Sequence, residues 1–160
     1  MSSIRHLVTR FFEVARAKDL TSAEMTEVVS WLRPDLLELF ESQQVADQRH
    51  GYECAKRILA QDAGRIDLVG AALLHDVGKR HARLGAIGRT LATVAGALPI
   101  PTFKRWSLYL DHPALGAAEL LGHDADPIIV DFTRHQERDR PQSIDEESWR
   151  LLRMSDLEAP

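Results

Sequence analysis

The sequence predicts an all-α fold, a helical bundle preceded by short N-terminal helices. Apolar residues recur at helical spacing along most of the chain, and several of these runs follow capping signals. No long run alternates apolar with polar residues, as a half-buried strand does. With 160 residues, 44% of them hydrophobic, the chain has the size and composition of one globular domain. We expect residues 1–44 to pack on a bundle formed by residues 45–160, as one structural unit.

Five helices are expected in the first half of the chain, each from apolar residues at helical spacing. Thr21 and Glu24 form a capping-box pattern before the second helix, and Pro34 separates that helix from the third. His50 falls on the inward side of the fourth. The five helices cover residues 4–18, 22–32, 35–40, 45–60 and 66–76.

The second half begins with residues 80–110, where glycines and prolines alternate with apolar stretches and scattered basic residues. One interpretation is a helix, a loop and a short helix packed over the core. The functional interpretation is a lid that presents cations to an anionic substrate, and a weaker alternative is a segment that touches a membrane. Asp126 and Ser143 are the expected N-caps of later helices, Ser143 in a capping box with Glu146. These later helices cover residues 113–121, 127–132 and 144–156.

Charge, hydropathy and cysteine content indicate which kinds of partner and which compartment to expect. The net charge is -4 with neutral histidines, so no basic field favours nucleic acid. No stretch approaches the ~20 apolar residues of a membrane span, and residues 1–16 carry too many charges for a signal peptide. The single cysteine, Cys54, fits a reducing compartment. We therefore expect a cytoplasmic protein that binds neither nucleic acid nor membrane. The oligomeric state is left open, with a homodimer as one alternative.

The most informative stretch is residues 71–79, which read AALLHDVGK. An apolar helix here ends in His75 and Asp76, and a buried pair of this kind is costly unless a partner satisfies it. A divalent cation is such a partner, because imidazole and carboxylate are both ligands for these ions. The alternative is an ordinary helix C-terminus, in which His75 meets the last carbonyls and Gly78 caps the turn.

Four of the seven histidines fall on or at the ends of expected helices with apolar neighbours. Together with two carboxylates they form a series of six candidate ligands spread over several helices, as in metal sites inside bundles. Such a set suits two ions bridged by one carboxylate, with positions left for water or substrate. Any helical protein with several histidines offers a comparable series, so spacing alone leaves a metal-free bundle open. The candidates are His50, His75, Asp76, His112, His135 and Asp156.

Several segments also resemble a known family. Residues 74–79 (LHDVGK), preceded by His50 and followed by Asp156, resemble the signature of the HD-domain superfamily of metal-dependent phosphohydrolases, over about residues 45–158. Residues 112–116 (HPALG) and 134–138 (RHQER) are similar to the His-Pro-x-x-Gly and His-His-Glu-Arg segments of the subset that binds two metals.

The resemblance implies that His50, His75, Asp76 and Asp156 hold one metal ion. Asp76 would bridge to a second ion held by His112 and His135. The expected pair is Fe or Mn, with Mg, Ni, Co and Zn as alternatives.

The implied reaction is attack of a metal-activated water on a phosphomonoester or phosphodiester, with Asp76 and Lys79 as the catalytic residues. The expected substrate is a small phosphorylated molecule of the nucleotide-like class. Apart from the resemblance, three further side chains lie near the proposed ligands in the sequence and are candidates to bind the substrate phosphate. Solvated charge is the alternative for Arg134 and Arg138, and a structural role is the alternative for His81. The candidate substrate-binding residues are Lys79, His81, Arg134 and Arg138.

The departures from the family also carry information. Gln136 stands where the second histidine of the two-metal subset would be, and the Gly-Tyr-Pro of the HD-GYP cyclic-di-GMP phosphodiesterases is absent. We therefore expect neither a third metal nor hydrolysis of cyclic-di-GMP. Glu137 is a candidate to hold a ligand histidine. Two alternatives remain: a mixed-valent di-iron oxygenase of the HD fold, and a non-catalytic, metal-dependent ligand sensor.

Overall fold

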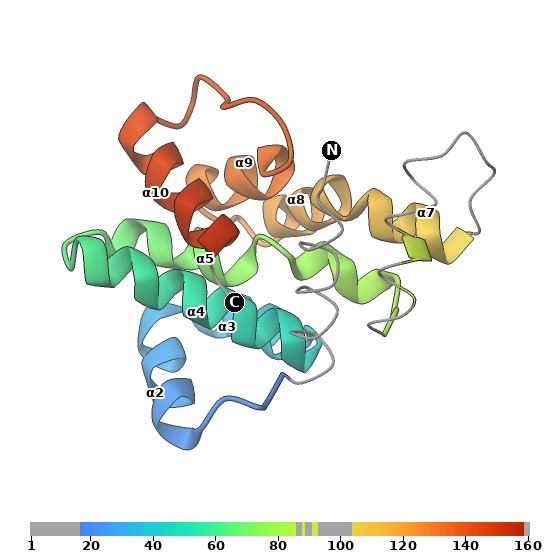
Figure 1. Cartoon of the computed structure of the whole chain (residues 1–160), viewed down its shortest axis with the longest axis horizontal. Coiled ribbons are helices and arrows are strands. Elements are labelled where there is room, and N and C mark those ends of the chain that lie inside the picture. Colours follow the sequence, from blue (N-terminus) through green and yellow to red (C-terminus); the bar gives the residue numbers. More distant parts are fainter. Residues whose placement is uncertain (1–16, 86–87, 89–90, 93–103, 159–160) are drawn as a thin grey trace.

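The computed structural model of the protein describes residues 17–85, 88, 91–92 and 104–158. Within these ranges all regular secondary structure is helical, which confirms the expected all-α class (Figure 1). The helix expected over residues 4–18 falls almost wholly outside the described residues, as does the middle of the 80–110 segment. None of the described helices is both long enough and apolar enough to cross a bilayer.

The N-terminal helices are α2 (Ser22–Trp31) and α3 (Pro34–Glu41). The capping box of α2 is confirmed: the Thr21 hydroxyl accepts a hydrogen bond from the Glu24 amide at 3.3 Å, and the Glu24 carboxylate accepts one from the Thr21 amide at 2.7 Å. Pro34 takes the first position of α3, where its missing N–H leaves no carbonyl unpaired. Both helices contribute buried side chains to the same apolar core as the helices that follow.

The centre of the fold is α5 (Val69–Leu74), which packs against α4 (Val45–Gln61) and two later helices. The sequence predicts one helix over residues 66–76, but the structure replaces its ends with the short 3-10 helices η1 (Ile66–Leu68) and η2 (Val77–His81). The α-helix therefore ends two residues before Asp76. Apolar spacing does not distinguish an α-helical turn from a tighter 3-10 turn, because both bury every third or fourth residue.

The remaining helices are α7 (Lys104–Leu110), α8 (His112–Gly122), α9 (Pro127–His135) and α10 (Glu146–Glu158). Helix α8 packs on α9 and η2, while α10 crosses α4 and α5 (Figure 1). Every element that carries a predicted ligand thus contacts α5 or η2. Trp31 and Trp149 pack against the main core, and Trp106 packs against a smaller cluster formed around Ala82.

The predicted capping box of the last helix is wrong. Asp145, directly before α10, accepts a hydrogen bond from the Ser148 amide at 2.9 Å and so caps the helix. Ser143 instead donates from its hydroxyl to the Asp131 carboxylate of α9 at 2.6 Å. Asp126 does precede α9, but its side chain makes no capping hydrogen bond.

Candidate metal centre

Five of the six predicted ligands come together where α4, α5, η2, α8 and α10 meet. The Nε2 atom of His50 lies 3.1 Å from Oδ1 of Asp156, and Nε2 of His75 lies 3.5 Å from the same oxygen. On the other side, Nε2 of His75 lies 3.6 Å from Oδ2 of Asp76, and Nε2 of His112 lies 3.4 Å from its Oδ1. We call these five side chains the His–Asp cluster. Within it, one ligand atom each from His50, His75 and Asp76 lies within 4.8 Å of the others.

A glycine beside the first ligand lets α4 approach α5 closely. A Cβ at Gly51 would lie 2.9 Å from the carbonyl oxygen of Leu73, so only glycine fits there without a shift of the backbone. The buried face of α4 also contains Ala55 and Ile58, which pack into the main core. His50 is therefore held against the end of α5, and its ring lies 5.3 Å from the ring of His75.

A second close approach joins η2 to α8. A Cβ at Gly78 would overlap the carbonyl oxygen of His112 and would lie 2.8 Å from the amide nitrogen of Gly116. The contact is backbone against backbone, which a flexible side chain cannot relieve. It places the first residue of α8, His112, beside Asp76, the residue that precedes η2.

Hydrogen bonds fix the tautomers of two histidines. Nδ1 of His75 lies 2.8 Å from the carbonyl oxygen of Ala72, and Nδ1 of His112 lies 2.8 Å from that of Tyr109. A carbonyl only accepts, so Nδ1 donates in each ring, and Nε2 of the neutral ring keeps its lone pair. Both Nε2 atoms are buried and have no hydrogen-bond partner among the described residues. This pairing of a carbonyl on one ring nitrogen with a free lone pair on the other is typical of metal-binding histidines.

The carboxylates of the cluster are held in their charged form. Burial alone would raise the pKa of Asp76, but the positive charge of Lys79, together with His75 and His112, holds that pKa well below its ordinary value. Burial would also raise the pKa of Asp156, but the interactions with His50 and His75 outweigh burial, and the pKa of Asp156 is lowered. Two ionised carboxylates therefore face unpaired imidazole nitrogens in a buried space, and this combination favours a bound cation.

The same environment raises the pKa of His75, whereas it lowers the pKa values of the two carboxylates. Burial alone would lower the pKa of His75, because a charged imidazole loses its hydration. The neighbouring charges of Asp76 and Asp156 outweigh burial, and the pKa of His75 is raised. The two carboxylates thus favour a positive charge at this point of the cluster.

Lys79 lies inside the site, with only 7% of its surface exposed. Its ammonium group forms an ion pair with Oδ2 of Asp76, the oxygen that also faces His75. The sequence predicts Lys79 as a contact for a substrate phosphate, and the structure adds that it neutralises a proposed metal ligand.

The other predicted site residues lie outside these contacts. The His135 ring, at the end of α9, makes no hydrogen bond or ion pair with the part of the chain that the structure describes, so its role as a ligand stays a prediction. His81 lies 3.1 Å from the Glu119 carboxylate on α8, and Arg134 and Arg138 are exposed. Phosphate binding by these three residues also stays a prediction.

Three contacts to the cluster were not foreseen from the sequence. Gln136 donates from Nε2 to the carbonyl oxygen of His75 at 2.6 Å, and Arg153 donates to Oδ2 of Asp156 at 3.2 Å. The Sγ atom of Cys54 lies 3.7 Å from Nε2 of His50, one turn away on α4. Sequence signals existed for two of them: Arg153 precedes Asp156 by one helical turn, as Cys54 follows His50.

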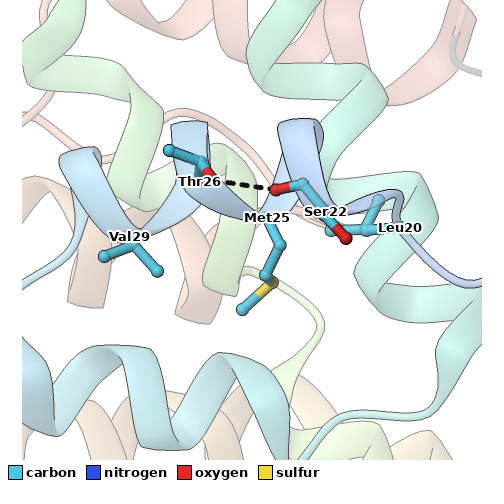
Figure 2. Close-up of a pocket in the computed structure, with 5 residues that line it drawn as sticks. All are labelled: Leu20, Ser22, Met25, Thr26 and Val29. Atoms are coloured by element: carbon cyan, nitrogen blue, oxygen red, sulfur yellow. Dashed lines mark hydrogen bonds between the residues drawn. The ribbon is translucent and has the colours of Figure 1, made fainter.

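A separate hollow lies along α2, away from the cluster. Figure 2 shows its lining, in which Met25 and Val29 lie along one side of α2 and the Thr26 hydroxyl donates to the Ser22 carbonyl oxygen at 2.8 Å. Leu20 completes the lining, and none of these side chains is charged. The hollow therefore offers no group for acid–base or metal chemistry.

Among the described residues, the His–Asp cluster is the site best suited to bind a metal ion. Its nitrogen and oxygen donors come from five elements, converge in a buried space and include two unpartnered imidazole nitrogens. Comparison of the chain with protein-family models, with curated proteins and with solved structures found no match. The function is therefore inferred from the site.

Proposed function

We propose that the protein is a metal-dependent phosphohydrolase that acts on a phosphomonoester or phosphodiester of a small, nucleotide-like molecule. The observation that carries the proposal is the pair of buried Nε2 atoms, on His75 and His112, which face the ionised Asp76 without a hydrogen-bond partner. A buried polar atom left unpaired costs about 1–3 kcal/mol, so two of them beside one carboxylate call for an additional group. One cation on each side of Asp76 would satisfy these nitrogens and share the carboxylate.

The donors divide into two groups around Asp76. His50, His75 and Asp156 lie on the side of its Oδ2, and would hold the first cation with it. His112 lies on the side of Oδ1, where a second cation would be held with the predicted ligand His135. Imidazole and carboxylate donors suit Fe or Mn, the expected ions.

When bound, such ions lower the pKa of a coordinated water and offset the negative charge of a phosphate. The chain supplies the rest of the site. The carbonyls of Ala72 and Tyr109 keep His75 and His112 in the tautomer that can bind metal. Lys79 holds a positive charge at the edge of Asp76, and we propose that it donates to a phosphate oxygen of the substrate.

The test is hydrolysis of p-nitrophenyl phosphate and bis-p-nitrophenyl phosphate by protein loaded with Mn²⁺ in the absence of oxygen. We expect turnover by the wild type and a loss of at least about 100-fold in His75→Gln, since one ligand is removed. His123→Gln is the matched control, because His123 lies outside the cluster and contacts Asp35 at the surface.

The same assay separates the alternatives. Turnover without oxygen excludes oxygenase chemistry as the source of the activity. Binding of Mn²⁺ with no turnover of either ester or of a nucleotide panel would contradict the proposal and favour a metal-dependent sensor. Equal turnover by His75→Gln and His123→Gln would place the reaction outside the cluster.

A further inference from the structure

Gln136 connects the ends of three helices. It follows α9 directly and is buried, and its side-chain amide donates to the carbonyl oxygens of His75 at 2.6 Å and Thr133 at 3.2 Å. Its own backbone carbonyl accepts a hydrogen bond from Arg153 on α10. The end of α9 is thereby tied both to the turn that carries His75 and to the helix that carries Asp156.

Arg153 completes the connection to the cluster. The NH1 atom that meets the Gln136 carbonyl also donates to Oδ2 of Asp156 at 3.2 Å. The other oxygen of Asp156, Oδ1, faces His50 and His75 at 3.1 and 3.5 Å. The two oxygens of one carboxylate are thus assigned to different partners: one to the guanidinium and one to the histidines.

We propose that Arg153, held by Gln136, is a positioning residue that limits Asp156 to one oxygen for the cation. The inference rests on the proposed function, since it requires a cation in the His–Asp cluster. A carboxylate binds metal through one or both oxygens, and a charge-assisted hydrogen bond to one of them favours binding through the other alone. The coordination position that a second Asp156 oxygen would fill is then left for water or substrate.

The arrangement also gives a role to Gln136, which stands where the two-metal subset that the sequence resembles has a histidine. Both hydrogen bonds use the side-chain nitrogen of Gln136 as the donor, so its amide is held against these two backbone carbonyls. Gln136 therefore acts on the cluster through Arg153 and through the turn that carries His75.

The experiment measures Co²⁺ binding and its visible absorption spectrum in the full chain. Arg153→Met removes both hydrogen bonds, Arg153→Lys restores one positive donor group, and Arg150→Met is the matched control. Arg150 is exposed on the same helix, one turn earlier, and its side chain hydrogen-bonds to the Met154 sulfur rather than to the cluster. Far-UV circular dichroism and thermal unfolding without metal establish that each variant is folded.

We expect Arg153→Met to bind Co²⁺ about 10–100-fold more weakly than the wild type, as for other residues that hold metal ligands. Its visible bands should also weaken, because a second Asp156 oxygen raises the coordination number of Co²⁺. Arg153→Lys should recover most of the affinity and the spectrum, and Arg150→Met should match the wild type. A purely structural role would lower the unfolding temperature without changing the spectrum.

The inference is overturned if Arg153→Met, folded and loaded with Co²⁺, matches Arg150→Met in affinity and spectrum. If Arg153→Met does not fold, Arg153→Gln replaces it under the same criteria, because glutamine keeps a donor for the Gln136 carbonyl. A wild type that takes up no Co²⁺ overturns the proposed function and this inference together. A wild type that binds Co²⁺ beside unchanged Arg153 variants overturns only the inference.

Discussion

His112 and Asp76 meet across the junction of α8 and η2, with 3.4 Å between Nε2 of the histidine and Oδ1 of the carboxylate. Because Oδ2 of Asp76 faces His75, the two oxygens of this carboxylate point to histidines from different elements. A bridging carboxylate needs this arrangement, with one oxygen for each ion.

Gly78 maintains the distance between η2 and α8, so Gly78→Ala should disturb the His112 side of the cluster. The added Cβ would overlap the His112 carbonyl, and η2 must move away from α8. We expect a loss of about 1–3 kcal/mol in the free energy of unfolding, in the range of overpacked cores. We also expect weaker binding of the second cation. Urea unfolding and metal titration measure the two effects.

The matched control is Gly122→Ala, because a Cβ at Gly122 meets nothing within 4 Å. Alanine is the better helix former, so this variant should be as stable as the wild type or more stable by ~0.5–1 kcal/mol. If Gly78→Ala is as stable as Gly122→Ala and binds metal as well, then the close backbone contact does not position His112.

Asp76→Asn should remove metal binding and leave Lys79 buried without its carboxylate partner. Breaking a buried ion pair by removing one member costs about 3–5 kcal/mol, so we expect the single variant to be strongly destabilised. The double variant Asp76→Asn/Lys79→Met also removes the buried ammonium group, so most of the stability should return while metal uptake does not. Chemical unfolding and metal analysis of both variants separate the structural from the functional role. Metal uptake by the stable double variant would exclude Asp76 as an essential ligand.

Much of this arrangement can be read from the sequence where the determinants are local. The Thr21–Glu24 capping box and the position of Pro34 predicted the starts of α2 and α3, because these signals act within one helical turn. The end of α5 was not predictable in the same way, because the 3-10 turn after it fits Gly78 against a backbone from a distant part of the chain. Ser143 was misassigned as a cap because its hydroxyl has a partner on α9 that only the tertiary structure provides.

In the candidate site, too, the sequence predicted some residues and not others. The order of histidines and carboxylates identified five side chains that the structure brings together. The residues that hold them were harder to find, since Gln136 acts through the backbone carbonyl of His75 and no sequence pattern marks a carbonyl. Glu137, which the sequence suggested for this task, is exposed.

The ion pair between Glu24 and Arg49 should give the protein a pH-dependent stability that is independent of the metal. The Arg49 guanidinium contacts both carboxylate oxygens of Glu24, at 2.7 and 2.9 Å. Together with the hydrogen bond from the Thr21 amide, it lowers the pKa of Glu24 from 4.5 to about 2. Since the folded pKa lies below the unfolded one, the stabilisation is fully present above pH 4.5 and is lost as the pH falls toward 2.

Glu24→Gln tests this pair, because glutamine keeps the capping box but removes the charge. We expect the free energy of unfolding of Glu24→Gln to be about 1 kcal/mol lower than that of the wild type at pH 7, since the pair is partly exposed. This difference should become smaller below pH 4.5. Urea unfolding from pH 7 to pH 3 follows the difference, with Glu38→Gln as an exposed control on α3. A difference that does not change over this range would mean that the ionised form of Glu24 is not what stabilises the fold.

The most direct test of the central claim is the metal content of the protein, purified without chelator under nitrogen and then reconstituted with Fe²⁺ or Mn²⁺. We expect about two ions per chain in the wild type, with Asp76 between them. His112→Ala should retain about one ion, since the donors on the Oδ2 side of Asp76 remain. A wild type that contains no transition metal, and takes none up on reconstitution, would contradict the claim that the His–Asp cluster is a metal centre.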